Sequence, residues 1–225
     1  MCASCYRAGA IVPVPRRLRA AVDYQPGVSD ARALTRMAWK TVEHEGAYPD
    51  LRLGAGALVE VSGLPGAGKS SFACRLLDAV RGPTLLVAAE EGLSPSLSAR
   101  LLRCNIRRED FSILTRATVD TVVAFAVERK VVALALDSVQ ECAWSASELR
   151  HVLEVVRTLD LLVAVMQVTK TGAPAGKMAL QHEADVCVTV EAMRFSLTKS
   201  RYQDLTSASG DVLPQRNQEV PRDAA

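Results

Sequence analysis

The run GLPGAGKSS at residues 63–71 has the residue types and the spacing of a loop that binds phosphate, because it matches the pattern GxxxxGK(S/T) in full. Glycines let such a loop turn its backbone N–H groups inward around phosphate oxygens, and the following helix adds the positive end of its dipole. In this pattern Lys69 reaches the terminal phosphates, and the hydroxyl of Ser70 is a ligand of Mg²⁺. The sequence therefore predicts a site for ATP with Mg²⁺.

The predicted nucleotide-binding residues are Gly63, Leu64, Pro65, Gly66, Ala67, Gly68, Lys69, Ser70 and Ser71. A glycine-rich turn without a ligand is the alternative. An apolar run precedes the loop and a helical pattern follows it. This context is the one that a phosphate-binding loop requires, and it argues against the alternative.

Asp137 ends the apolar run VVALAL at residues 131–136. An acid at the carboxyl end of a buried strand is the usual second metal residue of a phosphate-loop protein, and it holds Mg²⁺ through water. The alternative is that Asp137 caps a following turn. Because a phosphate-binding loop is present in the same chain, we favour the metal role.

Hydrolysis also needs a group that orients and deprotonates the attacking water. Glu90 and Glu91 follow the apolar run at residues 83–89, which places an acid near the γ-phosphate. Glu90 is the predicted general base, Glu91 is the second choice, and a solvated turn is the alternative for both. Gln167 ends the run LLVAVMQ and suits contact with the γ-phosphate, although a lone glutamine there is also typical of a loop.

Short apolar runs that alternate with helical patterns must position these residues. The runs at 57–62, 83–89, 111–115, 131–137 and 161–167 alternate with helical patterns at 69–80, 94–103, 118–130 and 145–159. Near-continuous apolar strands separated by helices predict an α/β fold, with a mostly parallel sheet that carries helices on both faces. The runs at 185–192 and 194–200 predict an antiparallel end to that sheet.

Two helix starts are marked in the sequence. Ser94 followed by Pro95 is typical of a cap with proline at the first helical position. Ser145 and Glu148 have the spacing of a capping box.

The sequence suggests three regions. Residues 1–50 form an N-terminal extension, with a basic segment, VPVPRRLRAA, and one amphipathic helix within 29–46. Residues 51–205 form the nucleotide-binding domain. Residues 206–225 are polar and lack periodicity, which predicts a disordered tail.

Composition limits the possible partners and compartments. The 225 residues carry a net charge of +2, so contact with nucleic acid must depend on local basic patches. The start of the chain lacks the apolar run of a signal peptide, and no window approaches 18 apolar residues. We therefore expect a cytoplasmic protein without a membrane segment. Cys2 and Cys5 form a CxxC, but no second CxxC completes the four ligands of a structural zinc site.

The order of these motifs resembles the core of the RecA superfamily, and within it the RadA/Sms branch of bacterial DNA-repair ATPases. The run QVTKTGAPAGKMALQHEADVCVTVE at 167–191 resembles the HVTK-x-G-x-x-AGP-x-x-LEH-x-x-D stretch of that branch. LDSVQ at 136–140 is similar to its DSIQ, and LTKSRYQ at 197–203 stands in the place of its KNRFG motif. The resemblance covers about residues 50–205.

The resemblance implies a RecA-like P-loop NTPase core and roles for particular residues. Glu90 is the implied base, and Gln167 stands where the RadA branch has His and RecA has Gln. Lys199 and Arg201 match the Lys and Arg of KNRFG, which can reach across to the phosphates of a neighbouring subunit. This implies a homo-oligomer, a ring or filament with ATP at subunit interfaces. An ordinary exposed strand with two basic side chains is the alternative.

The resemblance also implies contact with single-stranded DNA. Residues 168–176, with Lys170 and Lys177, correspond to the second DNA-facing loop of the RecA core. A loop that carries lysines can follow a phosphate backbone without reading bases. Trp144 could stack on a base, and an aromatic plug for the core is the alternative.

Several features depart from the RadA pattern. KNRFG has become Lys199-Ser200-Arg201-Tyr202-Gln203, only Cys2 and Cys5 stand in place of a four-cysteine zinc module, and no Lon-like domain follows residue 205. The predicted function is a DNA-stimulated ATPase that acts on single-stranded DNA in recombination or repair. The alternative is a RecA-fold, ATP-dependent switch that acts on a protein partner. No segment resembles the acceptor lid of a small-molecule kinase.

Overall fold

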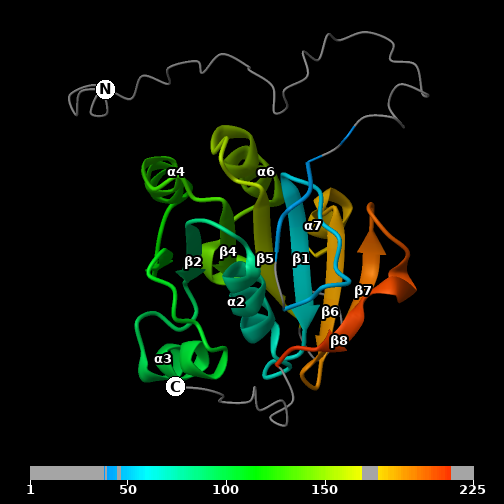
Figure 1. Cartoon of the computed structure of the whole chain (residues 1–225). Helices are drawn as coiled ribbons and strands as arrows, with labels where there is room; N and C mark the ends of the chain where they lie inside the picture. Colours follow the sequence, from blue (N-terminus) through cyan, green and yellow to red (C-terminus); the bar gives the residue numbers. More distant parts are fainter. Residues whose placement is uncertain (1–37, 39, 45–46, 169–176, 214–225) are drawn as a thin grey trace, which may run out of the picture. The chain divides into compact units, whose positions relative to one another are not determined.

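The computed structural model describes residues 38, 40–44, 47–168 and 177–213 (Figure 1). The chain divides into two units, Met1–Ala38 and Trp39–Ala225, and of the first unit only residue 38 is described. Every helix and strand discussed below belongs to the second unit. The basic segment and the CxxC pair of the sequence lie outside the described residues.

In the described part of the second unit, an eight-stranded sheet has the order β3-β2-β4-β5-β1-β6-β7-β8 (Figure 1). The strands are β1 Ala57–Gly63, β2 Thr84–Ala88, β3 Phe111–Leu114, β4 Ala133–Asp137, β5 Leu161–Gln167, β6 Val186–Glu191, β7 Arg194–Ser200 and β8 Ser209–Asp211. The first six strands of this order pair in parallel, and β7 and β8 add antiparallel pairs. This confirms the predicted α/β fold and its antiparallel end.

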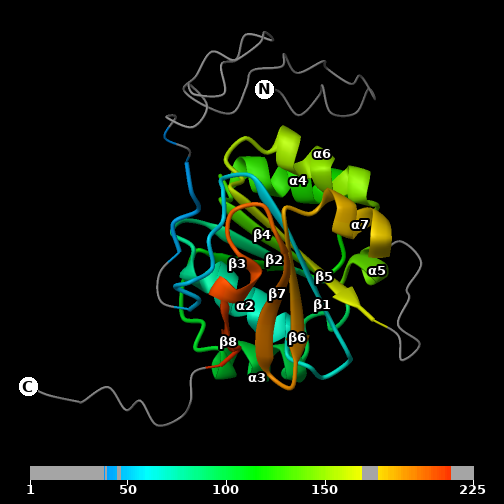
Figure 2. The same cartoon turned by 90° about the vertical axis from the view of Figure 1, so that its right-hand side faces the viewer.

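Helices cover both faces of the sheet. They are α2 Lys69–Ala79, α3 Pro95–Arg103, α4 Val119–Glu128, α5 Val139–Cys142, α6 Ala146–Val155 and α7 Lys177–Glu183. Side chains of α2 and α3 pack in one core with alternate residues of the central strands, and those of α4, α5, α6 and α7 pack in a second core with the intervening residues. Figure 2 shows α4, α6 and α7 grouped on the side of the sheet away from α2. Since both faces are covered, the central strands are apolar at nearly every position.

Both predicted helix starts are confirmed. The side chain of Ser94 accepts a hydrogen bond from the amide of Leu97, with Pro95 at the first helical position of α3. Ser145 and Glu148 form a reciprocal capping box at the start of α6. Such caps satisfy amides that a helix leaves without intrahelical acceptors.

The described part of the predicted helix at 29–46 is not helical. Thr41 pairs with Gly54 and His44 pairs with Val80 in isolated antiparallel bridges, while residues 1–37 lie outside the description. Apolar spacing alone predicted a helix here, but pairing with the segment before β1 and with the end of α2 determines the local conformation.

The core also extends before residue 51. Tyr48 is buried, and its ring stacks on Phe72 of α2 at 4.5 Å between centroids and meets Phe195 of β7 edge-on at 4.9 Å. Val42 is also buried in this core. The segment that the sequence places in an N-terminal extension therefore contributes to the hydrophobic core.

The predicted disorder after residue 205 does not hold for residues 206–213. A 3₁₀ helix, Leu205–Ser207, leads into β8, which pairs antiparallel with β7. Ala208 and Val212 are buried. Together with the partly buried Leu213 they carry the packing, and so few side chains show no periodicity that sequence reasoning could detect. Residues 214–225 lie outside the description.

Arg108 holds the C-terminal end of α2, which has no basic residue in its own last turn. Its guanidinium donates to the carbonyls of Leu77, Asp78, Val80 and Gly82. It also donates to both carboxylate oxygens of Asp110, at 2.8 and 2.9 Å. A cation here satisfies carbonyls that the helix leaves unpaired and offsets the negative end of its dipole.

Candidate functional site

Parallel pairing brings the predicted site residues to one edge of the sheet. Gly63 of β1 pairs with Gln167 of β5, and Asp137 of β4 pairs with Ala88, two residues before Glu90. The carboxyl ends of these parallel strands therefore meet where the predicted phosphate-binding loop (residues 63–71, called the phosphate-binding loop below) begins. This is the usual place for a ligand in an open α/β sheet.

A cavity of about 410 Å³ lies at this edge. Its lining contains Pro65, Gly66, Gly68, Lys69, Ser70 and Ser71 of the phosphate-binding loop. Glu90 and Gln167 line it as well. The structure thus brings together six of the nine predicted phosphate-binding residues, the predicted base and the predicted γ-phosphate contact, whereas Gly63, Leu64, Ala67 and Asp137 do not line the cavity. The volume of the cavity lies within the range typical of small-molecule sites.

The phosphate-binding loop has a backbone that requires glycine at two packed positions. Gly63 has φ of +155°, and a Cβ on it would lie 2.2 Å from the carbonyl oxygen of Val190. Gly68 has φ of +109°, and a Cβ there would lie 2.6 Å from Sδ of Met193. Side chains at these positions would clash with the β6–β7 hairpin, so both glycines are needed for the loop to pack against it.

The N-terminal end of α2 is open toward the cavity. Gly68 caps it without a side-chain hydrogen bond, and its first turn contains no acidic residue. The orphan amides and the positive end of the helix dipole are therefore available to an anion.

Lys69 lies over the phosphate-binding loop. Its Nζ donates to the carbonyl of Leu64 at 2.9 Å. Burial lowers the pKa of Lys69 below its ordinary value, although the carboxylates of Glu90 and Asp137 act in the opposite direction.

Asp137 and Ser70 fit a divalent metal ion. Asp137 is buried, and its Oδ1 has no hydrogen-bond partner among the described residues. Burial raises the pKa of Asp137 above its ordinary value, while hydrogen bonding from Ser70 and the charge of Arg100 lower it. An oxygen pair of this kind suits Mg²⁺, which binds through one or two protein oxygens and substrate phosphates. Within the described ranges, no three His, Cys, Asp or Glu residues cluster as a complete metal site.

The two adjacent acids differ in their environments. Glu91 accepts a hydrogen bond from Nη2 of Arg100 at 2.5 Å. The side chain of Glu90 is exposed at the cavity and has no hydrogen-bond or ion-pair partner among the described residues, although its backbone amide donates to the carbonyl of Asp137 at 3.1 Å. Glu90 is therefore the acid whose carboxylate is available to a water molecule.

Gln140, which sequence reasoning did not assign a role, holds the end of β5 beside the cavity. Its Nε2 donates to the carbonyl of Gln167 at 3.0 Å, and its Oε1 accepts from the amide of Gln167 at 3.3 Å. These two bonds fix the backbone from which the Gln167 side chain reaches the cavity. Only its position in LDSVQ, three residues after Asp137, could have pointed to it.

Lys199 and Arg201 do not line the cavity of their own chain. Ser200, between them, pairs with Val186 at the start of β6, and Val186 pairs with Val59 of β1. Four residues separate Val59 from Gly63, a rise of about 13 Å along the strand. The two basic residues therefore lie toward the opposite edge of the sheet from the phosphate-binding loop.

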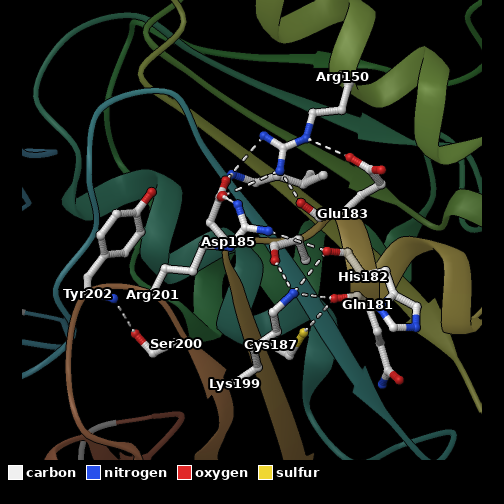
Figure 3. Close-up of polar contacts among 12 residues, drawn as sticks. Arg150, Gln181, His182, Glu183, Asp185, Cys187, Lys199, Ser200, Arg201 and Tyr202 are labelled. Carbon is white, nitrogen blue, oxygen red and sulfur yellow. Dashed lines mark hydrogen bonds and ion pairs between the residues drawn. The ribbon is translucent and has the colours of Figure 1, made fainter. Parts of the chain in front are cut away.

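Lys199 caps the C-terminal end of α7 (Figure 3). Its Nζ donates to the carbonyls of Gln181, His182 and Ala184 at 2.6, 3.0 and 2.6 Å. An ammonium group has three donors, so these three carbonyls use all of them.

Arg201 and Arg150 converge on the buried carboxylate of Asp185 (Figure 3). Arg201 donates to Oδ1 at 2.9 Å, and Arg150 donates to both oxygens at 3.3 and 3.4 Å. The amide of Leu58 donates to Oδ2 at 2.9 Å. Together with the contacts of Lys199, these bonds join β1, α6, α7 and β7. The Arg201 side chain remains 53% exposed.

The remaining sequence predictions concern Trp144, the DNA-facing loop and membrane segments. Trp144 is buried in the core beside α6, which supports the packing interpretation rather than stacking on a base. Residues 169–176 of the predicted DNA-facing loop lie outside the description. No helix among the described residues is long and apolar enough to cross a membrane.

Comparison with known proteins finds distant relatives. A DNA repair protein RadA from Aquifex aeolicus (strain VF5) is 26% identical over 181 residues, which cover 70% of this chain and 41% of the relative. RadA proteins from Pseudomonas aeruginosa (28% over 153 residues; 60% of this chain and 33% of the relative) and Escherichia coli strain K12 (25% over 169 residues; 68% and 35%) also match. No family model matches the chain.

The chain is thus a distant relative of RadA proteins and has a RecA-like α/β core. The matched region spans less than half the length of each of these three relatives.

Proposed function

We propose that this chain binds and hydrolyses ATP with Mg²⁺, and that single-stranded DNA stimulates the hydrolysis. The observation that supports the nucleotide site most directly is the uncapped start of α2, which opens into a cavity beside a buried carboxylate oxygen without a partner. The distant relationship to proteins named DNA repair protein RadA supports a role in DNA repair or recombination.

In this proposal the phosphates lie in the phosphate-binding loop, and Lys69 exchanges the Leu64 carbonyl for a terminal phosphate. Ser70 binds Mg²⁺ directly and Asp137 binds it through water. The metal ion, when bound, neutralises charge on the β- and γ-phosphate oxygens.

Glu90 then orients the attacking water and accepts its proton, since its carboxylate faces the cavity without a partner. Gln167 contacts the γ-phosphate from the end of β5, where Gln140 fixes the backbone. In this proposal, phosphate binding, metal binding, activation of water and contact with the γ-phosphate are therefore carried out by different residues.

We further propose that copies assemble head to tail, so that Arg201 of one copy reaches the ATP of the next. The position of Arg201 toward the opposite sheet edge, and its exposed side chain, support this arrangement. A cation supplied in trans stabilises the charge of the transition state. Lys199 is less suited to this role, because it would have to release three carbonyls.

The experiment that tests the proposal is ATP hydrolysis by the full chain with and without single-stranded DNA, across a salt series. We expect stimulation that fades steeply as salt rises, because contacts with the phosphate backbone release counterions. Hydrolysis that is indifferent to DNA would favour a switch that acts on a protein partner. Absence of both binding and hydrolysis of ATP would overturn the nucleotide assignment.

A further inference from the structure

A half-buried arginine that lines the nucleotide cavity lies between two acidic residues. Arg100 of α3 places Nη2 at 2.5 Å from Oε1 of Glu91 and Nη1 at 3.3 Å from Oδ2 of Asp137. Its side chain is 15% exposed, and those of Glu91 and Asp137 are 21% and 4% exposed. Each side of the planar guanidinium therefore serves a different carboxylate, which a lysine could not do with the same geometry.

The cavity needs this positive charge. Glu90 and Glu91 line a cavity whose expected ligand is a polyphosphate, and the carboxylate of Asp137 lies 3.3 Å from Arg100 of the same lining. Like charges in a partly buried site repel strongly, because the local dielectric is lower than that of water. Arg100 offsets part of this repulsion, because its guanidinium pairs with both Glu91 and Asp137.

Both carboxylates remain incompletely satisfied. Oδ1 of Asp137 and Oε2 of Glu91 are buried and have no hydrogen-bond partner among the described residues. One oxygen of each carboxylate is thus paired with Arg100, while the other remains without a partner. Asp137 can gain a second cation through Oδ1.

A second arginine on the same helix provides a natural comparison. Arg103 lies three residues further along α3 and lines the same cavity, but it is exposed. It forms no ion pair within the described part of the chain. Its charge can attract a nucleotide from a distance without neutralising particular carboxylates.

We propose that Arg100 is the resident counter-ion of the metal-binding carboxylate. It pairs with Asp137 and Glu91 in the absence of a divalent cation, and it gives up Asp137 but keeps Glu91 when Mg²⁺ is bound with the nucleotide. The inference rests on the proposed nucleotide site. Its consequence is that the site accepts metal-free ATP, because Arg100 neutralises charge on Asp137 and Glu91 that would otherwise repel the phosphates.

Equilibrium binding of a fluorescent ATP analogue, in EDTA and in saturating Mg²⁺, tests this inference without measuring turnover. For Arg100→Gln we expect the affinity in EDTA to fall at least about 10-fold, since one partner of a buried charge pair is removed. In Mg²⁺ we expect a fall of less than about 3-fold, because the metal ion then neutralises Asp137. Binding of metal and nucleotide would thus become more strongly coupled.

Arg103→Gln is the matched control. It removes the same charge from the same helix, and we expect it to weaken binding in EDTA and in Mg²⁺ by similar factors. An Arg100→Gln variant that behaves like Arg103→Gln, or that binds like the unmodified chain in both conditions, would overturn the counter-ion role.

The double variant Glu91→Gln/Arg100→Gln keeps the test decisive if Arg100→Gln folds poorly. It removes the charge of one of the two carboxylates that lose their counter-ion when Arg100 is replaced. We expect the ratio of its dissociation constant in EDTA to that in Mg²⁺ to exceed the ratio of the unmodified chain and, where Arg100→Gln folds, to lie below the ratio of that variant. A ratio equal to that of Arg103→Gln contradicts the inference. If the unmodified chain fails to bind in Mg²⁺, the proposed function falls together with the inference; if it binds and the ratios do not move, only the inference falls.

Discussion

At the scale of single residues, the cavity separates two neighbouring carboxylates into different roles. Glu91 is held by Arg100, whereas Glu90 faces the cavity without an ion-pair partner in the described structure. A general base must be free to accept a hydrogen bond from water. The environment, rather than the residue type, therefore distinguishes the two acids.

Glu90→Gln should bind ATP with nearly unchanged affinity but hydrolyse it about 10²-fold or more slowly, because general-base catalysis typically contributes that much. The measurement is single-turnover hydrolysis beside equilibrium binding. Glu91→Gln is the matched control and should lose less activity than Glu90→Gln. The reverse ranking of the two variants would transfer the role of base to Glu91.

Sequence reasoning found the residues whose spacing is fixed by one short motif or one strand end. Lys69 and Ser70 follow the loop glycines directly, and Asp137 ends an apolar run. Arg100 could not be found in this way, because its two partners lie 9 and 37 residues away and meet it only in the fold.

At the scale of elements, the two ends of α2 differ in whether their backbone groups have hydrogen-bond partners. Its first turn is open toward the cavity, while Arg108 occupies the carbonyls at its last turn. Asp110 in turn orients the guanidinium of Arg108. Anchoring the C-terminal end leaves the N-terminal amides in a fixed position for phosphate.

Asp110→Asn should lower the free energy of unfolding at pH 7, and this deficit should shrink in acid. Hydrogen bonds from Arg108 hold the pKa of Asp110 below its ordinary value. The carboxylate therefore stabilises the fold above that ordinary value, and its contribution is lost as the pH falls toward the lowered pKa. Urea unfolding at pH 7 and near pH 3 measures the difference.

Glu109→Gln is the neighbouring control, and we expect it to change stability little at either pH. Equal stability of the Asp110 and Glu109 variants at pH 7 would mean that the orientation of Arg108 does not depend on Asp110.

Strands and helices with their own apolar pattern could be predicted, including the strands that carry the site. Three pieces could not be predicted, for physical reasons. Thr41 and His44 pair with distant backbone, β8 depends on pairing with β7, and α7 is a short helix held at its end by Lys199. None of these has enough buried side chains to leave a periodic signal.

At the scale of the whole molecule, the proposed assembly depends on two sites toward opposite edges of one sheet. The phosphate-binding loop follows the carboxyl end of β1, and Arg201 follows β7 near the amino ends of β1 and β6. Contact between unlike surfaces produces rings or filaments. Each ATP site would then combine residues of two copies.

Mixing inactive Arg201→Ala chains with inactive Lys69→Ala chains should recover part of the ATPase activity. In some pairs, the intact loop of one copy meets the intact arginine of another. Hydrolysis over a range of mixing ratios measures this, and each variant alone provides the baseline. Mixtures that stay as inactive as their components would show that Arg201 does not act across an interface.

Lys199→Met provides a contrast within the same β7 segment. Because Lys199 caps α7, we expect the loss to appear mainly as lower thermal stability. If mixing rescues Lys199→Met as fully as Arg201→Ala, the capping interpretation is insufficient.

The phosphate-binding loop is also connected by hydrogen bonds, through Met193, to the last described residues of the chain. The amide of Met193 donates to the carbonyl of Ala67 at 2.9 Å, and the amide of Val212 donates to the carbonyl of Met193 at 2.8 Å. Leu213 reaches the cavity lining itself. Truncated or tagged forms of this protein should therefore keep residues 208–213. A boundary chosen from sequence polarity alone would remove the segment whose contacts support the phosphate-binding loop.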